Sequence, residues 1–538
     1  MFGLPTLPSL EGRSETRAFE DTAETQLGRA TAPLARSHPG QSGVLSLAEG
    51  SDAFATRMLL AEAAERSLNV QYYIWHLDLT GTLLMHALRQ AAERGVRVRL
   101  LLDDNNTRGT DADLAALDSH PNVEVRLFNP FLQRDWRWLG YLHDFGRLNR
   151  RMHNKSLTAD NQVTIVGGRN IGDEYFDAGQ EISFVDLDVL AVGAVVPLVS
   201  ADFDRYWASA SAYPIASLLP KADQDALERI AESEAGIRTS QAAALYLAAL
   251  DRSDHIKRLA AVELALEWTD VKLVSDDPAK ALGKAKKRAL MPQRLVEVLG
   301  APQKELLLVS PYFVPTASGT KALTEQAARG VVVSVLTNSL AATDVPAVHA
   351  GYAKRRHALL RGGLKLFELK PDGIAPRSAR AHHGKLTGSS GASLHAKTFA
   401  LDGERVFVGS FNLDPRSAAL NTESGFVIDS PRLAGQIADA FEKELATQSY
   451  TLRLDSDGRI EWQDRATPAG PARVYHHEPL TPAWKRAMVW VLSWLPIEWL
   501  LRRTPRSQRT ARRVATLHDR HDIAAIRAAT ATIGRRTR

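Results

Sequence analysis

Two stretches of the chain share one order of apolar and polar segments. Each begins with an apolar run, passes through a Gly-Thr pair into an alternation typical of an amphipathic helix, and ends with "RGV" and a second apolar run. The stretches cover residues 68–104 and 305–339. Runs such as "VRVRLLL" and "VVVSVL" are typical of strands in a sheet that helices cover on both faces. The pattern therefore predicts an α/β protein built from two copies of one unit.

The two copies predict five regions along the 538 residues. Between them, polar and alanine-rich segments such as "QDALERIAESEAG" indicate helices, and each copy is long enough to be a domain. We expect an N-terminal extension over 1–40, a first half over 41–215, a helical connector over 216–290, a second half over 291–450 and a C-terminal extension over 451–538.

The amino-acid composition excludes several kinds of chemistry and location. The absence of cysteine excludes disulfides, zinc–thiolate sites and cysteine nucleophiles. The first residues lack a basic start followed by an apolar run, so we expect no secretory signal. No uncharged apolar stretch reaches the roughly 18 residues of a spanning helix. The net charge is +5, and the segment from residue 502 onward holds eleven arginines and two aspartates. The positive charge therefore gathers at the C-terminus.

One polar motif, H-x-K-x4-D-x6-G-x2-N, occurs once in each copy. Its histidine and lysine lie two positions apart in a strand-like segment, which places both side chains on one face. The Asp-Asn and Asp-Gly pairs that follow are typical of hairpin turns, and the return strand brings the asparagine back toward the lysine. The residues are His153, Lys155, Asp160, Gly167 and Asn170, and His395, Lys397, Asp402, Gly409 and Asn412.

The duplicated histidine, lysine and asparagine fit chemistry on a phosphodiester. Lysines and asparagines donate to the non-bridging oxygens and stabilise the charge of the transition state. One histidine attacks phosphorus, and the other protonates the departing alkoxide and then activates the incoming hydroxyl. This chemistry demands no metal and no cofactor. The two aspartates are candidate catalytic residues, but an interpretation as turn formers is favoured because aspartate is common in such turns.

These motifs resemble the phospholipase D superfamily over residues 40–450. The segments "RRMHNKSLTADNQVTIVGGRNIGDEYF", "GSFNLDPRSAALNTESG" and "HPGQSGVLSLAEGSDAF" are similar to the bacterial cardiolipin synthases, in particular the C-type. The resemblance implies two pseudo-symmetric phospholipase D-type domains, each a mixed β-sheet flanked by helices, with a helical connector and an amphipathic C-terminal extension.

The resemblance also implies roles for single residues. His153 would be the nucleophile and His395 the acid and base. An acid downstream of each motif would orient the histidine of its own copy. The candidate is Glu423 in the second copy and either Asp186 or Asp188 in the first, where Asp186 is favoured. The phosphate would be held by the motif lysines together with Asn170, Asn412 and Ser410, which stands where the first copy has Gly168.

The implied reaction transfers a phosphatidyl group to phosphatidylglycerol and yields cardiolipin. The donor is phosphatidylglycerol or phosphatidylethanolamine, and no residue pattern indicates a helper protein. Three alternatives stay open: a phospholipase D that releases phosphatidic acid, a nuclease of the same fold, and a non-catalytic scaffold. The aromatic segments 72–76 and 311–313 line an acyl-chain entrance or pack in the core. The pair His382-His383 is interpreted as solvated loop residues rather than metal ligands.

The segment 482–503 predicts contact with a membrane. It holds Trp484, Trp490, Trp494 and Trp499, is divided by Pro496, and is flanked by lysines and arginines. Short tryptophan-rich helices with basic flanks suit the membrane interface, and an arginine tail attracts anionic lipids. A hairpin packed on the body and a nucleic-acid-binding tail are the alternatives. We expect a peripheral protein on the bacterial cytoplasmic membrane and no nucleic-acid partner.

Overall fold

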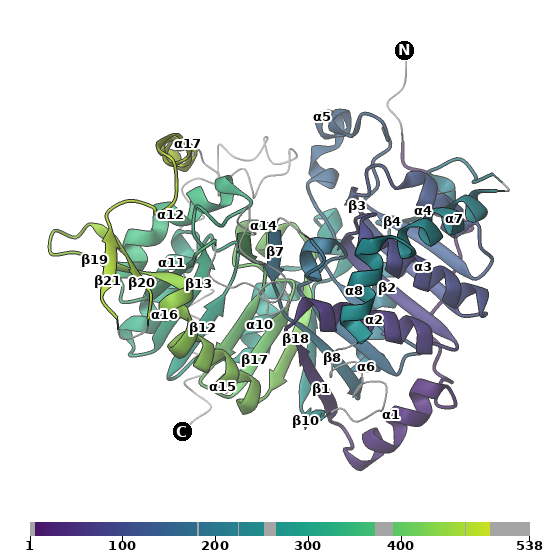
Figure 1. Cartoon of the computed structure of the whole chain (residues 1–538), viewed down its shortest axis with the longest axis horizontal. Coiled ribbons are helices and arrows are strands. Elements are labelled where there is room, and N and C mark those ends of the chain that lie inside the picture. Colours follow the sequence, from purple (N-terminus) through teal and green to yellow (C-terminus); the bar gives the residue numbers. More distant parts are fainter. Residues whose placement is uncertain are drawn as a thin grey trace.

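The computed structural model describes residues 6–179, 182–223, 225–251, 265–371, 391–467 and 470–494. Two twisted sheets lie side by side, and helices of each half pack on both faces of its sheet (Figure 1). The predicted α/β fold with two related halves is therefore confirmed. The pair His382-His383, Trp499 and the arginine-rich tail lie outside the described residues.

The first sheet has nine strands within the described ranges, in the order β10-β1-β8-β6-β5-β2-β3-β4-β9. The neighbours β2, β3 and β4 pair in parallel, and the other pairs are antiparallel. The strands are β1 (Ser42–Leu47), β2 (Ser67–Ile74), β3 (Arg97–Asn106), β4 (Val123–Phe128), β5 (Ser156–Ala159), β6 (Val163–Gly167), β8 (Asp188–Gly193), β9 (Ala212–Pro214) and β10 (Glu267–Thr269).

The second sheet repeats eight strands of this order, has no counterpart of β10, and adds two strands at the opposite edge: β11-β18-β17-β16-β12-β13-β14-β19-β20-β21. Its parallel neighbours are β12, β13 and β14. The strands are β11 (Val271–Ser275), β12 (Glu305–Val309), β13 (Val332–Asn338), β14 (Lys365–Leu369), β16 (Thr398–Leu401), β17 (Arg405–Gly409), β18 (Ser424–Asp429), β19 (Ser449–Leu454), β20 (Ile460–Arg465) and β21 (Ala472–Tyr475). A separate parallel pair, β7 (Ile182–Val185) with β15 (Gly391–Leu394), joins the two halves.

The helices begin where the sequence provides capping groups. Asp78 accepts the N–H of Gly81 at the start of α3, and Thr316 accepts the N–H of Gly319 at the start of α11. The first half and its connector hold α1 (Gln26–Ser37), α2 (Gly50–Ala63), α3 (Leu79–Glu93), α4 (Asp111–Asp118), α5 (Arg137–Leu148), α6 (Val196–Trp207), α7 (Ala226–Arg238) and α8 (Gln241–Asp251). The second half holds α10 (Met291–Leu299), α11 (Ala317–Ala328), α12 (Pro346–Arg361), α14 (Pro415–Ala419), α15 (Pro431–Asp439), α16 (Leu445–Gln448) and α17 (Ala483–Trp494).

Each half has its own apolar core, and a third core lies between them. That shared core joins Val166 and Val189 of the first sheet to Leu307, Val406 and Phe426 of the second. The seam between the halves is therefore a packed apolar contact, so the two sheets hold a fixed position against each other.

Two regions differ from the expected pattern. The range 216–290 contains α7 and α8 as expected, but it also contains β10 and β11, which extend one sheet each. Most of β19, together with β20 and β21, falls in the range expected to hold interfacial helices and a tail. These short strands lie at or near sheet edges, where pairing partners rather than local pattern decide the structure. Within the described ranges, no helix is long and apolar enough to cross a membrane.

Candidate active site

The histidine and lysine of each motif lie directly before a strand that is hydrogen-bonded on both sides. Strand β5 lies between β2 and β6, and β16 lies between β12 and β17. His153 and His395 are 7% and 6% exposed, and both lysines are 1% exposed. Lys155 donates to the carbonyl oxygen of His153 at 2.6 Å, and Lys397 bonds the carbonyl of His395. Each ammonium group therefore lies folded beside its own histidine.

Each histidine is bonded to an acid of the other half. The Nδ1 atom of His153 lies 2.8 Å from Glu423 Oε2, and the Nδ1 atom of His395 lies 2.5 Å from Asp186 Oδ2. Both acids are candidates named from the sequence, but the expectation that each orients the histidine of its own copy is wrong. The site is complete only when the halves meet.

Short parallel pairings across the seam explain this exchange. Val185 of β7 pairs with Leu394 of β15, so the next residues along both strands, Asp186 and His395, also lie together. A parallel bridge between Met152 and Thr422 places His153 beside Glu423 in the same way. The N–H of His153 donates to Thr422 and that of His395 to Val185, so backbone bonds fix both registers.

The two pairs differ at one neighbouring position. Ser410 donates to Glu423 Oε2 at 2.5 Å, and its hydroxyl accepts the N–H of Ser424 at 3.0 Å. At the matching Gly168, a Cβ atom would lie 2.1 Å from Asp186 Oδ1, so a serine does not fit there. The expectation that Ser410 binds phosphate is not supported, because its one proton goes to Glu423.

The motif aspartates lie at the far ends of their strands, in the turns. Asp160 accepts the N–H groups of residues 65–67, and Asp402 accepts those of 303–305. Both have a positive φ, 51° and 54°, which aspartate tolerates better than most residues. These contacts support the interpretation as turn formers, since they tie each hairpin to the start of β2 or β12, and they give no support to a catalytic role.

The two motif asparagines are not equivalent. The amide of Asn170 donates to the Tyr175 hydroxyl at 2.9 Å and accepts the N–H of Ile74 at 3.2 Å. Asn412 is 3% exposed, and its Oδ1 has no hydrogen-bond partner within the described part of the chain. An unpaired buried amide oxygen is costly, so Asn412 keeps an acceptor position for a donor group such as a hydroxyl, and only its amide N–H₂ group could donate to a phosphate oxygen.

Known proteins are similar to this chain over both halves. The family model described as "Cardiolipin synthase, PLD-like domain" matches residues 58–207 and 295–445, one match in each half. The chain belongs to the cardiolipin synthase family. The resemblance inferred from the motifs is thus confirmed, and each match covers the central strands of one of the two sheets.

Relatives from this family align over most of the chain. Cardiolipin synthase C of Escherichia coli K12 is 52% identical over 88% of this chain and 100% of its own length. A cardiolipin synthase of Listeria welshimeri is 25% identical over 75% of this chain and 69% of its own. The crystal structure of a phosphatidylserine synthase from Haemophilus influenzae Rd KW20 has a TM-score of 0.50 and 14% identity, and covers 80% of this chain and 92% of that one. The last of these supports the fold alone.

Burial controls the charges in this family member's site. It lowers the pKa of His153 to about 4 and also lowers the pKa of His395, despite the acid beside each ring. It lowers the pKa of Lys155 to about 7 and that of Lys397 to about 8. Burial opposes ionisation of Glu423, but His153 and Lys155 outweigh it and lower its pKa. The empty site therefore holds carboxylates and neutral imidazoles near pH 7.

Aromatic rings enclose both histidines. Tyr73 meets His153 edge-on at 4.9 Å between ring centres, and Tyr175 meets His395 edge-on at 5.1 Å. Phe184 lies 5.2 Å from His395. Of the segments 72–76 and 311–313, Tyr72, Trp75 and Phe313 pack in the cores, so only part of each segment faces the site. Tyr175 and Phe184 were missed, because nothing local marks them.

Metal-binding groups lie outside the two motifs. Within the ranges that the structure describes, two clusters have ligand atoms close enough to share an ion: His76, Asp78 and Glu174, and Asp455, Glu461 and His476. The carboxylate of Asp78 already accepts the N–H groups of Gly81 and Asp173. Neither cluster includes a motif residue.

Proposed function

We propose that this protein is a phosphatidyltransferase that forms cardiolipin from phosphatidylglycerol and a second phospholipid. The observation that carries the proposal is the exchange of acids across the seam, which makes one site out of two distant histidines. A single histidine could serve as a nucleophile or as an acid, but transfer between two alcohols needs both functions at one phosphorus atom.

In the first step, the donor phosphodiester is held by Lys155, Lys397 and the amide of Asn412. The acid beside each ring occupies Nδ1, so Nε2 is the atom that faces the reaction. His153 Nε2 attacks phosphorus and a phosphorus–nitrogen bond forms. The bond from phosphorus to the headgroup oxygen breaks, and His395 gives that oxygen a proton from its own Nε2. The result is a phosphatidyl-histidine and a free headgroup alcohol.

The charge of the substrate prepares this step. His395 must carry a proton to act as an acid, yet burial lowers its pKa in the empty site. Burial removes the water that would stabilise positive charge in the site, and a bound phosphodiester anion supplies negative charge in its place. The anion therefore favours the protonated imidazole of His395 and both ammonium groups. Substrate binding thus switches the site to the protonation state that the reaction needs.

The second step reverses the roles. His395 accepts the proton of a hydroxyl group of phosphatidylglycerol, whose oxygen attacks phosphorus. The phosphorus–nitrogen bond breaks, which releases His153 and yields cardiolipin. If water attacks instead, the product is phosphatidic acid, so the rings around both histidines must keep water from the intermediate.

We place the protein peripherally on the cytoplasmic membrane, with α17 at the lipid interface. This finer assignment is supported by Trp484, Trp490 and Trp494, which are 66%, 62% and 73% exposed. The other face of α17 packs through Val489 on Leu340 and Ala350. The packed-hairpin alternative therefore accounts for one face of this helix and leaves the tryptophan-bearing face unexplained.

The test is a product assay with the purified protein. Vesicles of phosphatidylglycerol, with and without phosphatidylethanolamine, are incubated with the protein and the lipids are read by mass spectrometry. We expect cardiolipin as the main product and none with His395→Ala. Phosphatidic acid in place of cardiolipin would support the hydrolytic alternative, and cleavage of DNA without lipid turnover would support the nuclease.

A further inference from the structure

Exposed tryptophans gather on two helices, one in each half. Among the described residues, all five exposed tryptophans lie in or directly before α5 and in α17: Trp136, Trp138, Trp484, Trp490 and Trp494. Leu142 and Phe145 of α5 are 75% and 39% exposed. Contiguous exposed apolar surface is uncommon on soluble proteins and marks a surface that meets another molecule. The α5 cluster lies in a region for which the sequence suggested no such contact.

The segment directly before helix α5 is held in place by hydrogen bonds and ion pairs to buried or half-buried acids. Arg134 makes an ion pair with the buried Asp104 and bonds Asp111, and the N–H of Phe131 donates to Asp104 at 2.6 Å. Trp138 and Leu142 are four positions apart in the helix and so share one face. Because this segment is anchored by buried charges, the exposure of the apolar face does not come from poor packing.

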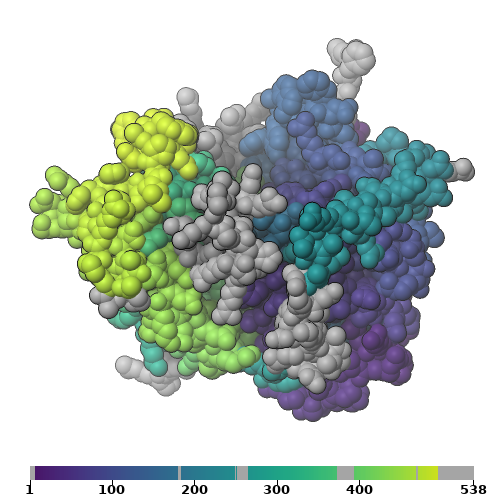
Figure 2. Space-filling model, viewed as in Figure 1, coloured from purple at the N-terminus to yellow at the C-terminus, as the bar shows by residue number. Residues whose placement is uncertain are grey.

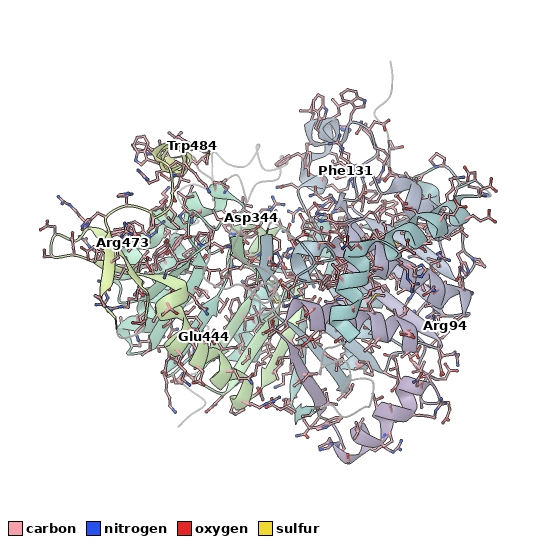
Figure 3. All side chains as sticks on the ribbon, viewed as in Figure 1. Arg94, Phe131, Asp344, Glu444, Arg473 and Trp484 are labelled. Carbon is pink, nitrogen blue, oxygen red and sulfur yellow. The ribbon has the colours of Figure 1, made fainter. Side chains whose placement is uncertain are left out.

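Both helices project from the edge of the molecule at which the site lies. The segment leading to α5 follows the carboxyl end of β4, and α17 packs on Leu340, close after the carboxyl end of β13. Figure 1 shows the two helices at the upper edge, one over each half. In Figure 2 they form separate projections of the surface, and in Figure 3 Trp484 lies on the outer side of α17 above Asp344.

A short chain of contacts links α5 to the reacting histidine. The Tyr141 hydroxyl of α5 donates to Asn105 at 3.0 Å, and the Asn105 amide reaches the Tyr73 hydroxyl at 3.5 Å. The Tyr73 ring lies edge-on against His153. On the other side, Asp344 accepts from Tyr312 at 2.6 Å, and its charge opposes in part the lowering of the Lys397 pKa by burial. Both histidines lie at this same edge of the sheets, because β5 and β16, which follow them, run antiparallel to β2 and β12.

We infer that α5 and α17 together form a two-point membrane-docking surface that holds the mouth of the site against the lipid bilayer. This inference rests on the proposed function, since a phospholipid substrate must enter from a bilayer. Tryptophan prefers the headgroup level of a membrane, where its ring is apolar and its N–H is wet. Two projecting helices can both contact a flat, deformable surface such as a bilayer. A lipid that enters between α5 and α17 then brings its headgroup to the histidines.

The absence of cysteine from the chain makes a direct test simple. Leu142→Cys and Val491→Cys are each labelled with an environment-sensitive fluorophore and mixed with vesicles of equal parts phosphatidylglycerol and phosphatidylcholine. We expect a blue shift and a severalfold rise in emission at both positions. Val296→Cys on α10, which is 66% exposed in the native protein, is the matched control and should not respond. A response at Val491→Cys alone would overturn the role of α5, as would a response to duplex DNA instead of vesicles.

A second variant separates docking from catalysis. Trp138→Gln with Leu142→Gln should lower vesicle binding at least tenfold in a flotation assay, while the control Leu198→Gln with Val296→Gln stays within twofold of the native protein. Cardiolipin formation in detergent micelles should stay within twofold for both variants, which also shows that they fold. Unchanged vesicle binding by the α5 variant would refute the docking surface. Absence of cardiolipin from the native protein in micelles, with the fluorescence response intact, would refute the proposed function alone.

Discussion

The two halves place the same histidine, lysine and asparagine at one seam, yet they surround them differently. His153 faces a glutamate that also receives the Ser410 hydroxyl, whereas His395 faces the shorter Asp186 beside a glycine. The sheets that carry them share eight strands in the same order. The repeated fold thus positions both imidazoles, whereas differences at single neighbouring residues can give each imidazole a separate catalytic role.

The largest expected effect separates the tasks of the two histidines. His153→Ala and His395→Ala should each lower cardiolipin formation by about 10⁴-fold, at the upper end of what a catalytic acid or base contributes. A phosphatidyl substrate with a p-nitrophenol leaving group needs no acid, because the phenolate departs unprotonated. We expect His395→Ala to release one equivalent of p-nitrophenol in a stopped-flow burst and His153→Ala to release none.

The reverse result, a burst with His153→Ala and none with His395→Ala, would exchange the two roles. Equal bursts from both variants would mean that either histidine can attack phosphorus. Circular dichroism of each variant serves as the control for folding.

Because each acid contacts the histidine of the other half, replacing the two acids should also have different effects, which are smaller than those of replacing the histidines. Glu423→Gln should act on His153 and lower the turnover of natural and activated substrates alike, by about 10³-fold, because the amide no longer holds the reactive tautomer. Asp186→Asn should act on His395, so the activated substrate should largely restore the rate of the first step, although the second step still needs His395 as a base. The burst rates of both variants with the activated substrate, measured by stopped flow, decide this. Restoration of Glu423→Gln instead would place each acid with the histidine of its own copy.

The sequence predicts the strands and the residues of the site better than it predicts how they pair. His153 and Lys155 could be placed on one face because strand alternation is local. The partner of His395 could not, because Asp186 reaches it through the pairing of β7 with β15, two short strands from different halves. Glu423 was found as a candidate from its segment, but assigned to the wrong ring for the same reason.

The edges of the sheets show the same limit. Strands such as "VVVSVL" carry enough apolar residues to be predicted directly, and β13 lies there. By contrast, β10 has three residues and pairs with β1 in the first sheet, while β11 begins two residues later and pairs in the second. The connector thus contributes one strand to each sheet, and its local sequence pattern does not indicate where the chain passes from one sheet to the other.

The glycine and the serine beside the acids test whether the difference between the halves is needed. Gly168→Ser forces a Cβ atom into Asp186 and should lower turnover by about 100-fold by displacing the acid. Ser410→Gly only removes a donor to Glu423 and leaves the Ser424 N–H without its partner, so we expect about tenfold. Both are measured as kcat/KM for cardiolipin formation. A larger loss from Ser410→Gly than from Gly168→Ser would contradict the contacts described.

The two lysines predict a change of phosphate affinity with pH. An ammonium group is charged below its pKa and loses its proton as pH rises, so phosphate binding weakens first near pH 7, through Lys155, and again near pH 8, through Lys397. We expect the affinity for a soluble phosphodiester to fall about tenfold between pH 7 and 9. Arginine stays charged over this range, so Lys155→Arg should leave only the step near pH 8, and Lys397→Arg only the step near pH 7.

Isothermal titration of each variant across this range measures those steps. Vesicle docking serves as the control, since it does not depend on the two buried lysines. An affinity that does not change from pH 7 to 9 would mean that burial does not lower the pKa of either lysine.

The smallest effect on activity is expected from the aspartates that give the motif its sequence signature. Asp160 is fully buried and accepts three backbone N–H groups, whereas the N–H groups that Asp402 accepts are mostly exposed to solvent. Asparagine tolerates the same positive φ, but its side chain has only one acceptor oxygen. Asp160→Asn therefore leaves a buried N–H group without an acceptor, whereas in Asp402→Asn water can replace the lost acceptor. Asp160→Asn should lower the free energy of unfolding by about 2 kcal/mol and Asp402→Asn by about 1 kcal/mol or less. Both should keep native turnover per folded molecule. A loss of turnover in a fully folded Asp160→Asn protein, measured beside its urea unfolding curve, would return this residue to the chemistry and remove the turn as its explanation.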